Sequence, residues 1–144
     1  MDWRICSIGT LESNPLWKER GAIRTGHSTT TIIKSNGAVM LVDPSLPSQI
    51  LGARLNERWG INIQDITHVF LTSFDPDRRR TLSGLSHAKW LMHEPEIESA
   101  ALAIGDELQH AEDDLELTSI LETHRDLLAG FDIANDKSVD GVDL

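Results

Sequence analysis

The polar residues that follow one apolar stretch are the best candidates for chemistry in this sequence. Residues 66–72 are rich in β-branched and apolar side chains, and they run directly into Ser73, Asp75, Asp77 and Arg78. That order is typical of a buried strand that carries polar side chains to the carboxyl edge of a sheet, where α/β proteins place their sites. Two carboxylates at such an edge could contribute to a metal site.

Two residues elsewhere in the sequence could join this loop in space. His27 precedes a predicted strand, and Asp43 follows the predicted strand 38–42. The candidate pocket therefore consists of His27, Asp43, Asp75, Asp77 and Arg78. A triad of Ser73, His27 and Asp43 can be drawn, but no spacing in the sequence requires it, and there is no Gly-x-Ser-x-Gly elbow.

The other histidines are better explained by structural roles. His68 lies in the middle of a predicted strand, and His124 lies on the apolar face of a predicted helix, where a hydrogen-bonded core histidine is expected. His87 and His93 flank a short predicted strand. None of these spacings is that of a metal-binding pair on one helical face.

The run Arg78-Arg79-Arg80 allows two interpretations. It could form an anion pocket for a carboxylate or phosphate ligand. Alternatively, the three guanidinium groups pair with Asp75, Asp77 and the acidic surface. We favour the second interpretation, because the chain has 23 acidic and 13 basic residues and therefore many carboxylates to pair with them.

A tight hairpin is the clearest local element in the sequence. Residues 29–34 and 38–42 are rich in β-branched and apolar side chains, and Ser35-Asn36-Gly37 between them supplies the positive φ angles that the turn needs. Residues 3–8 are expected to form an earlier strand, and residues 10–28 a long loop.

Helices are expected to alternate with the later strands. Pro47 begins a predicted helix in which Leu51, Leu55 and Trp59 recur every four residues, and Gly60 ends it. The remaining expected elements are a short strand at 88–92, a helix that starts at Pro95, a second helix at 115–128 and a polar tail at 132–144.

Composition excludes several classes of function. The formal net charge of −10 repels phosphate backbones and anionic lipid heads, so we expect no nucleic-acid partner and no membrane association. The N-terminal residues do not have the pattern of a secretory signal. A lone Cys6 cannot form an internal disulfide, which fits a reducing compartment, and we expect a cytoplasmic protein.

Two short motifs and the order of the elements resemble the metallo-β-lactamase superfamily. The motifs are Leu41-Val-Asp-Pro44 after the hairpin and residues 66–72 before the Asp-rich loop, and the resemblance covers roughly residues 3–105. It implies an αββα sandwich, of which this sequence would supply a truncated half with two C-terminal helices. The family binds one or two metals, commonly zinc, with a His-x-His-x-Asp-His loop at a strand end.

At the four positions of that loop this sequence has Ser73, Asp75, Asp77 and Arg78. Serine is a poor zinc ligand, and the guanidinium of Arg78 is always cationic and cannot coordinate a metal. We expect Arg78 to pair with Asp75 or Asp77. The ligands that the family takes from its second half have no matching positions here, so we expect no metal, no other cofactor and no catalytic residue.

The resulting hypothesis is a single α/β domain over residues 1–144, with a sheet-forming core at 3–92 and a two-helix segment at 95–128. We expect a non-catalytic pseudoenzyme with a structural or interaction role. Half of a sandwich leaves one sheet face uncovered, and the two C-terminal helices, a second copy or a protein partner would cover it. We therefore predict a homodimer or a protein complex. The alternatives are a zinc-dependent hydrolase with non-standard or partner-supplied ligands, and a small-anion binding module built on Arg78–Arg80.

Overall fold

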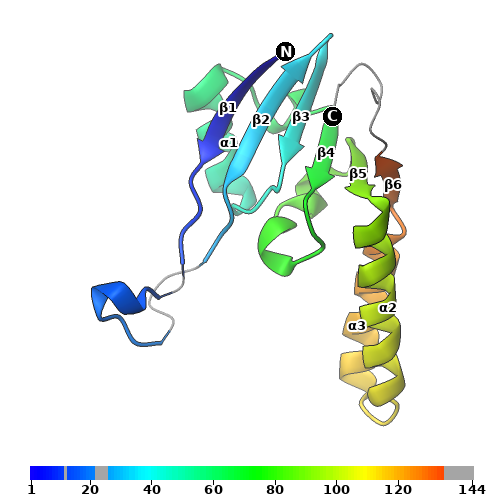
Figure 1. Ribbon diagram of the computed structural model, residues 1–144. Helices are drawn as coiled ribbons and strands as arrows, with labels where there is room; N and C mark the ends of the chain where they lie inside the picture. Colours follow the sequence, from blue (N-terminus) through cyan, green and yellow to red (C-terminus); the bar gives the residue numbers. More distant parts are fainter. Residues whose placement is uncertain (12, 22–25, 135–144) are drawn as a thin grey trace.

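Six strands form one mixed sheet in the computed structural model, which describes residues 1–11, 13–21 and 26–134 (Figure 1). The strands are adjacent in chain order, from β1 at one edge to β6 at the other. Strands β1 to β3 pair antiparallel, and β3 to β6 pair parallel. Their bounds are β1 Asp2–Ser7, β2 Thr30–Ser35, β3 Ala38–Val42, β4 His68–Leu71, β5 Lys89–His93 and β6 Phe131–Ala134.

The hairpin between β2 and β3 is confirmed. Asn36 and Gly37 have φ angles of 48° and 84°, and Ser35 faces Ala38 across the turn. This geometry suits the right-handed twist of the paired strands. The hairpin brings the end of β3 beside β4, so Asp43 lies at the same edge of the sheet as the loop that follows β4.

Three helices connect or follow the parallel strands: α1 (Ser48–Trp59), α2 (Glu94–His110) and α3 (Leu115–Leu128). Their positions confirm the helices expected from the sequence. Leu51 and Leu55 of α1 are fully buried, and Gly60 ends the helix in the left-handed conformation with a φ of 63°. Within the described residues, no helix combines the length and the apolar character that crossing a membrane requires.

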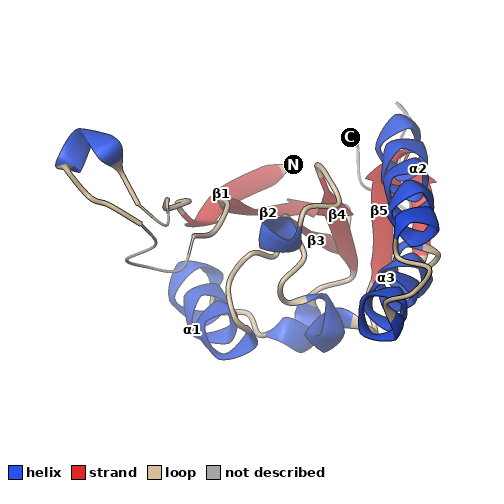
Figure 2. Ribbon diagram, turned by 90° about the horizontal axis from the view of Figure 1, so that it is seen from below, coloured by secondary structure: helices blue, strands red, loops and turns tan. Residues whose placement is uncertain are grey.

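The main hydrophobic core lies between one face of the sheet and all three helices. Leu41, Val69 and Met92 point from the strands into this cluster. The helices contribute buried residues that include Leu51 and Leu55 from α1, Ile104 from α2 and Leu128 from α3. The two C-terminal helices therefore share a face with α1, and Figure 2 shows them beside the β5 end of the sheet. One expectation from the sequence was that these two helices cover the opposite face of the sheet, and they do not.

The opposite face of the sheet carries a second apolar cluster, and the described members of this cluster all belong to strands. Ala38, Met40, Leu91 and Ala134 are buried there, and Ile33, Val42 and Phe70 pack against them. The strand register continues this face to the β1 edge, where Trp3 is paired with Ile33. Trp3 remains 64% exposed, so the apolar face is open at that edge.

The expected polar tail begins with a strand instead. Residues Phe131–Ala134 form β6, which pairs parallel with β5. Phe131 packs against Trp90 and Phe74, and this contact fixes the strand. Four residues with one aspartate have no clear alternation, and the stabilising partners come from distant parts of the chain, so local sequence does not reveal the strand. Residues 135–144 of the expected tail lie outside the described residues.

Candidate functional site

The carboxyl edge of the sheet is organised around Asp43, which follows β3. This residue is only 5% exposed, and its backbone has a positive φ of 53°, a conformation that aspartate tolerates better than most residues. Both carboxylate oxygens accept hydrogen bonds from Thr72, at the end of β4: Oδ1 from the backbone N–H at 2.8 Å, and Oδ2 from Oγ1 at 2.7 Å. Asp43 therefore fastens the loop after β4 to the end of β3.

Arg78 completes a network around this carboxylate. Its Nη1 donates to Thr72 Oγ1 at 2.7 Å and lies 3.7 Å from Asp43 Oδ2. Its Nε lies 3.7 Å from Asp75 Oδ2, an oxygen that also accepts a hydrogen bond from Ser73 Oγ at 2.7 Å. We call Asp43, Thr72, Ser73, Asp75 and Arg78 the arginine network. The expected Arg78–Asp75 pair is present, and the contact with Asp43 is an addition.

Burial sets the protonation preference of Asp43. Loss of solvent raises the pKa of this carboxyl above its ordinary value, and the charge of Asp75 adds to that effect. The two hydrogen bonds from Thr72 and the positive charge of Arg78 act in the opposite direction. A nearby cation is thus part of what keeps a buried carboxylate at this position in its charged form.

Asp77 and Arg80 form a separate contact. Arg80 Nη2 lies 3.4 Å from Asp77 Oδ1, while Nη1 donates to the carbonyl oxygens of Gly26 and Ser45 at 3.1 and 3.0 Å. Arg80 therefore ties the loop to the chain before β2 and after β3. Asp77 pairs with Arg80, whereas Arg78 pairs with Asp75.

His27 lies near this region but does not enter the network. It forms an isolated bridge with Thr10, and its Nδ1 is 3.4 Å from the carbonyl oxygen of Ser28. In the described part of the chain, no hydrogen bond joins its ring to Asp43 or Ser73. Ser73 donates to Asp75 instead, so the structure does not assemble the triad that the sequence allowed.

No histidine in the described ranges belongs to a cluster with metal-binding geometry. His68 is buried with Nδ1 2.8 Å from Thr67 Oγ1, and His87 Nε2 is 3.1 Å from the carbonyl oxygen of Ile63. Among residues 1–11, 13–21 and 26–134, no group of three or more His, Cys, Asp or Glu side chains could hold a metal ion.

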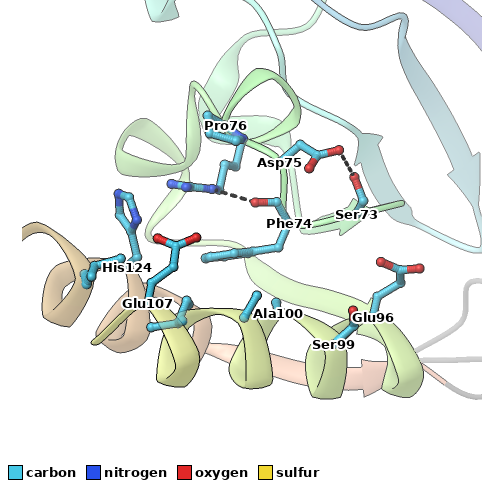
Figure 3. A pocket seen from close by; sticks show the side chains of 13 residues that line it. Ser73, Phe74, Asp75, Pro76, Glu96, Ser99, Ala100, Glu107 and His124 are labelled. Atoms are coloured by element: carbon cyan, nitrogen blue, oxygen red, sulfur yellow. Dashed lines mark hydrogen bonds between the residues drawn. The ribbon is translucent and has the colours of Figure 1, made fainter. Parts of the chain in front are cut away.

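A cavity of about 420 Å³ lies on the other side of the loop, between residues 73–79 and the helices α2 and α3 (Figure 3). Phe74, Ala100, Ile104 and Leu121 supply apolar surface to it. Its charged and polar lining includes Asp75, Arg79, Glu96, Glu107 and His124. We call this cavity the helix pocket.

Arg79 lies in the helix pocket with few polar partners. Its Nε donates to the carbonyl oxygen of Phe74 at 3.0 Å, and its guanidinium carbon is 4.4 Å from the centre of the Phe74 ring. No carboxylate in the described residues forms an ion pair with it. Burial lowers the pKa of Arg79, and the charge of Asp75 opposes this shift. The sequence alone does not distinguish Arg79 from Arg78 and Arg80, although Arg79 faces the helix pocket and the other two face the sheet edge.

His124 also belongs to the helix pocket, and its expected place in the apolar core is wrong. The side chain is half-buried and points towards the pocket that Glu107 and Arg79 line (Figure 3). Burial lowers the pKa of His124, Arg79 lowers it further, and Glu107 acts in the opposite direction. The helical periodicity located the correct face of α3, but it could not show that this face ends at a cavity.

Comparison with known proteins identifies the class. The sequence matches the model of the metallo-beta-lactamase superfamily over residues 23–142, and the chain belongs to that superfamily. A search of curated proteins finds no match.

One solved structure supports the fold. A Thermotoga maritima protein assigned to the metallo-beta-lactamases has a TM-score of 0.59 and 16% sequence identity, with 95% of this chain and 60% of that chain covered. This chain thus spans 60% of the length of that structure. Matches to a metallo-beta-lactamase of Bradyrhizobium japonicum and a beta-lactamase of Chitinophaga pinensis have TM-scores of 0.43 at 16% and 18% identity. They cover 49% and 51% of this chain, and 28% of each of those chains.

Proposed function

We propose that this domain is a catalytically silent member of the superfamily with a structural or interaction role. The observation that carries the proposal is the position of Arg78. Its guanidinium lies 3.7 Å from the carboxylates of Asp43 and Asp75, at the place that the family motif gives to its last histidine. A guanidinium has five N–H donors and no acceptor, so it supplies positive charge without being able to coordinate a metal.

The donor set of the loop does not fit a metal ion. Ser73 takes the first histidine position, and its hydroxyl donates to Asp75. Both oxygens of Asp43 accept hydrogen bonds from Thr72. Zinc sites use three or four Cys, His, Asp or Glu ligands, and here a fixed cation already lies between the carboxylates. We infer that hydrogen bonds and ion pairs, rather than a bound metal, stabilise this edge of the sheet.

Cys6 gives no support to an alternative nucleophilic site. The side chain is fully buried in the main core, and burial raises the pKa of its thiol, while Arg58 and Arg54 lower it to a smaller extent. A buried thiol with a raised pKa is a packing residue rather than a reactive thiolate. The role that we propose therefore rests on surfaces, not on a reacting group.

The exposed β1 edge of the second sheet face is one surface that such a role could use. The apolar residues of this face lie opposite all three helices, and Trp3 and Ile5 at the β1 edge are 64% and 42% exposed. Exposed apolar patches of this kind are typical of interaction sites. We propose that the domain acts by binding a second copy or another protein.

Metal content tests the proposal. Elemental analysis of the purified protein, repeated after incubation with zinc and desalting, should find far less than one metal ion per chain. A triple variant with Ser73→His, Asp75→His and Arg78→His restores the motif and serves as the positive control, because it should retain more zinc than the wild type. Stoichiometric metal in the wild type that is lost in Asp75→Ala and Asp77→Ala would overturn the silent site and favour the zinc-hydrolase alternative instead.

The small-anion alternative has one feature in its favour and one against it. Arg79 has no ion-pair partner in the described residues, so it could receive an anion. However, Asp75, Glu96 and Glu107 line the same pocket and would repel one. Inorganic phosphate should therefore leave the melting temperature unchanged, and a phosphate-dependent rise that disappears in Arg79→Ala would support this alternative.

A further inference from the structure

An arm between β1 and β2 presents two exposed apolar side chains. The arm spans residues 10–28, of which 10–11, 13–21 and 26–28 are described, and its tip, residues 13–21, projects away from the sheet in both views of the molecule (Figures 1 and 2). At its tip a short 3-10 helix, Pro15–Trp17, leaves Leu16 and Trp17 exposed by 90% and 67%. Large apolar side chains at the end of a projecting segment are typical of an interaction site.

Local hydrogen bonds hold this tip in shape. Asn14 Oδ1 accepts from the Leu16 N–H at 3.0 Å, and the Asn14 N–H donates to Glu19 Oε1 at 3.1 Å. The Lys18 N–H donates to the carbonyl oxygen of Pro15 at 3.0 Å, with Lys18 in the left-handed conformation. Because the backbone is already ordered, binding the tip to another surface costs little additional conformational entropy.

The helix pocket has the complementary surface. Its floor is apolar, through Phe74, Ile104 and Leu121, and its volume of about 420 Å³ falls within the range of pockets that bury a ligand. Glu96 and Glu107 lie on the α2 side of the pocket. They belong to a stretch, residues 94–116, that contains nine acidic residues and no lysine or arginine.

Charge favours the arm as the occupant of the helix pocket. Lys18 and Arg20 follow the apolar tip and are exposed. The described parts of the arm have two basic residues and one acidic residue, in a chain whose formal net charge is −10. An apolar tip followed by basic side chains therefore matches an apolar pocket with an acidic side, and electrostatic complementarity of this kind selects partners and orientation.

The arm must come from another molecule. In both views the arm and the α2–α3 pair lie at opposite ends of the sheet, so the tip does not approach the pocket of its own chain (Figures 1 and 2). We propose that two copies of this chain form a reciprocal dimer, in which Leu16 and Trp17 of each copy enter the helix pocket of the other. Each copy has one arm and one pocket, and in a two-fold pair both are used, so that no unfilled pocket is left to recruit a third copy.

This proposal goes beyond the role proposed for the arginine network, and each can fail alone. The mass in solution tests the dimer, whereas metal content tests the silent site. A dimer that contains stoichiometric zinc would refute only the proposal of a silent site. A monomer without metal would refute only the proposal of a dimer.

Sedimentation velocity on the full-length chain at micromolar concentrations is the first experiment. The wild type should sediment as a dimer. Trp17→Ala should raise the dissociation constant at least about tenfold, because tryptophan anchors in pockets are typical hot spots. Trp3→Ala tests the competing surface, the exposed β1 edge of the second sheet face: it removes an equally exposed tryptophan, and if the arm forms the interface the dimer should stay intact.

A charge exchange tests the pocket itself. Glu96→Lys with Glu107→Lys should weaken the dimer, as should Lys18→Glu with Arg20→Glu, and combining all four substitutions should restore association. The proposal would be overturned by a wild type that stays monomeric at concentrations on the order of tens of micromolar, because specific complexes usually have lower dissociation constants than that. So would a dimer that Trp3→Ala dissociates and Trp17→Ala does not, because the sheet face would then be the interface.

Discussion

The loop after β4 has two sides that treat neighbouring arginines in opposite ways. On the sheet side, Arg78 lies within 3.7 Å of two carboxylates and donates to Thr72. On the helix side, Arg79 has a carbonyl oxygen and an aromatic ring as its described partners. The first side is closed by its own side chains, and the second opens into a cavity of about 420 Å³.

This difference shows where the loop contributes to stability and where it remains available for binding. The buried carboxylate of Asp43 needs nearby positive charge and donors, and the arginine network supplies both. Arg79 meets no such demand, because the carboxylates that line the helix pocket lie farther away than an ion pair allows. We therefore expect substitutions on the sheet side to affect folding and substitutions on the helix side to affect association.

The largest effect should come from Asp43→Ala, with a loss of about 2–4 kcal/mol in the free energy of unfolding. It removes two acceptors for Thr72 and leaves Arg78 with one carboxylate fewer. Asp43→Asn is the matched variant: it keeps an acceptor for the Thr72 N–H and tolerates the positive φ, so it should cost less than half as much. Urea denaturation measures both. Equal losses for the two variants would mean that the negative charge of Asp43, which both variants remove, matters more than its hydrogen bonds to Thr72 or its backbone conformation.

A direct comparison of the two arginines comes next. Arg78→Ala should cost about 2 kcal/mol, because it removes a charged hydrogen bond to Thr72 and the counter-charge of a buried carboxylate. Arg79→Ala should cost about 0.5–1 kcal/mol, the scale of a partly exposed cation–π contact and one carbonyl hydrogen bond.

Thermal and urea unfolding of the two alanine variants, with Arg78→Lys as a charge-preserving control, separates geometry from charge. If Arg79→Ala proves the more damaging of the two, the distinction between a closed side and an open side is wrong. A loss for Arg78→Lys close to that of Arg78→Ala would show that the forked guanidinium, not the charge alone, is required.

The sequence was informative where local patterns decide the structure. The hairpin at Asn36-Gly37, the stripe of Leu51 and Leu55, and the strand before the Asp-rich loop are all present because turn chemistry and periodicity act over a few residues. The pairing of Arg78 with Asp75 was also predictable, since the two residues are three positions apart in a short loop.

What the sequence could not show depends on contacts between distant segments. The strand β6 is held by β5 and by the Phe131 contacts, so its four residues have no signal of their own. The helix pocket forms only when the loop and two helices are placed together, so local sequence does not predict that Arg79 and His124 line it. The exposure of Trp17 likewise depends on the direction of the arm.

The smallest expected effect concerns His124, and it distinguishes an electrostatic pocket from an inert one. Burial and the charge of Arg79 lower the pKa of this imidazole below its ordinary value of 6.5, so the unfolded chain binds the proton more readily than the folded chain does. The stability that depends on neutral His124 is therefore complete above pH 6.5 and declines as the pH falls towards the lowered native pKa. The difference in the free energy of unfolding between the wild type and His124→Gln should show this decline. Urea unfolding at concentrations too low for dimerisation measures it.

Adding Arg79→Gln to the wild-type histidine should shrink the decline, because the neighbouring positive charge is one cause of the lowered pKa. If the stability difference between the wild type and His124→Gln does not change from pH 5 to 8, solvent fills the helix pocket well enough to cancel the effects of burial and of the Arg79 charge on the pKa. The apolar floor would then be a weaker anchor for Trp17 than the dimer requires, so this titration also bears on the open side of the loop.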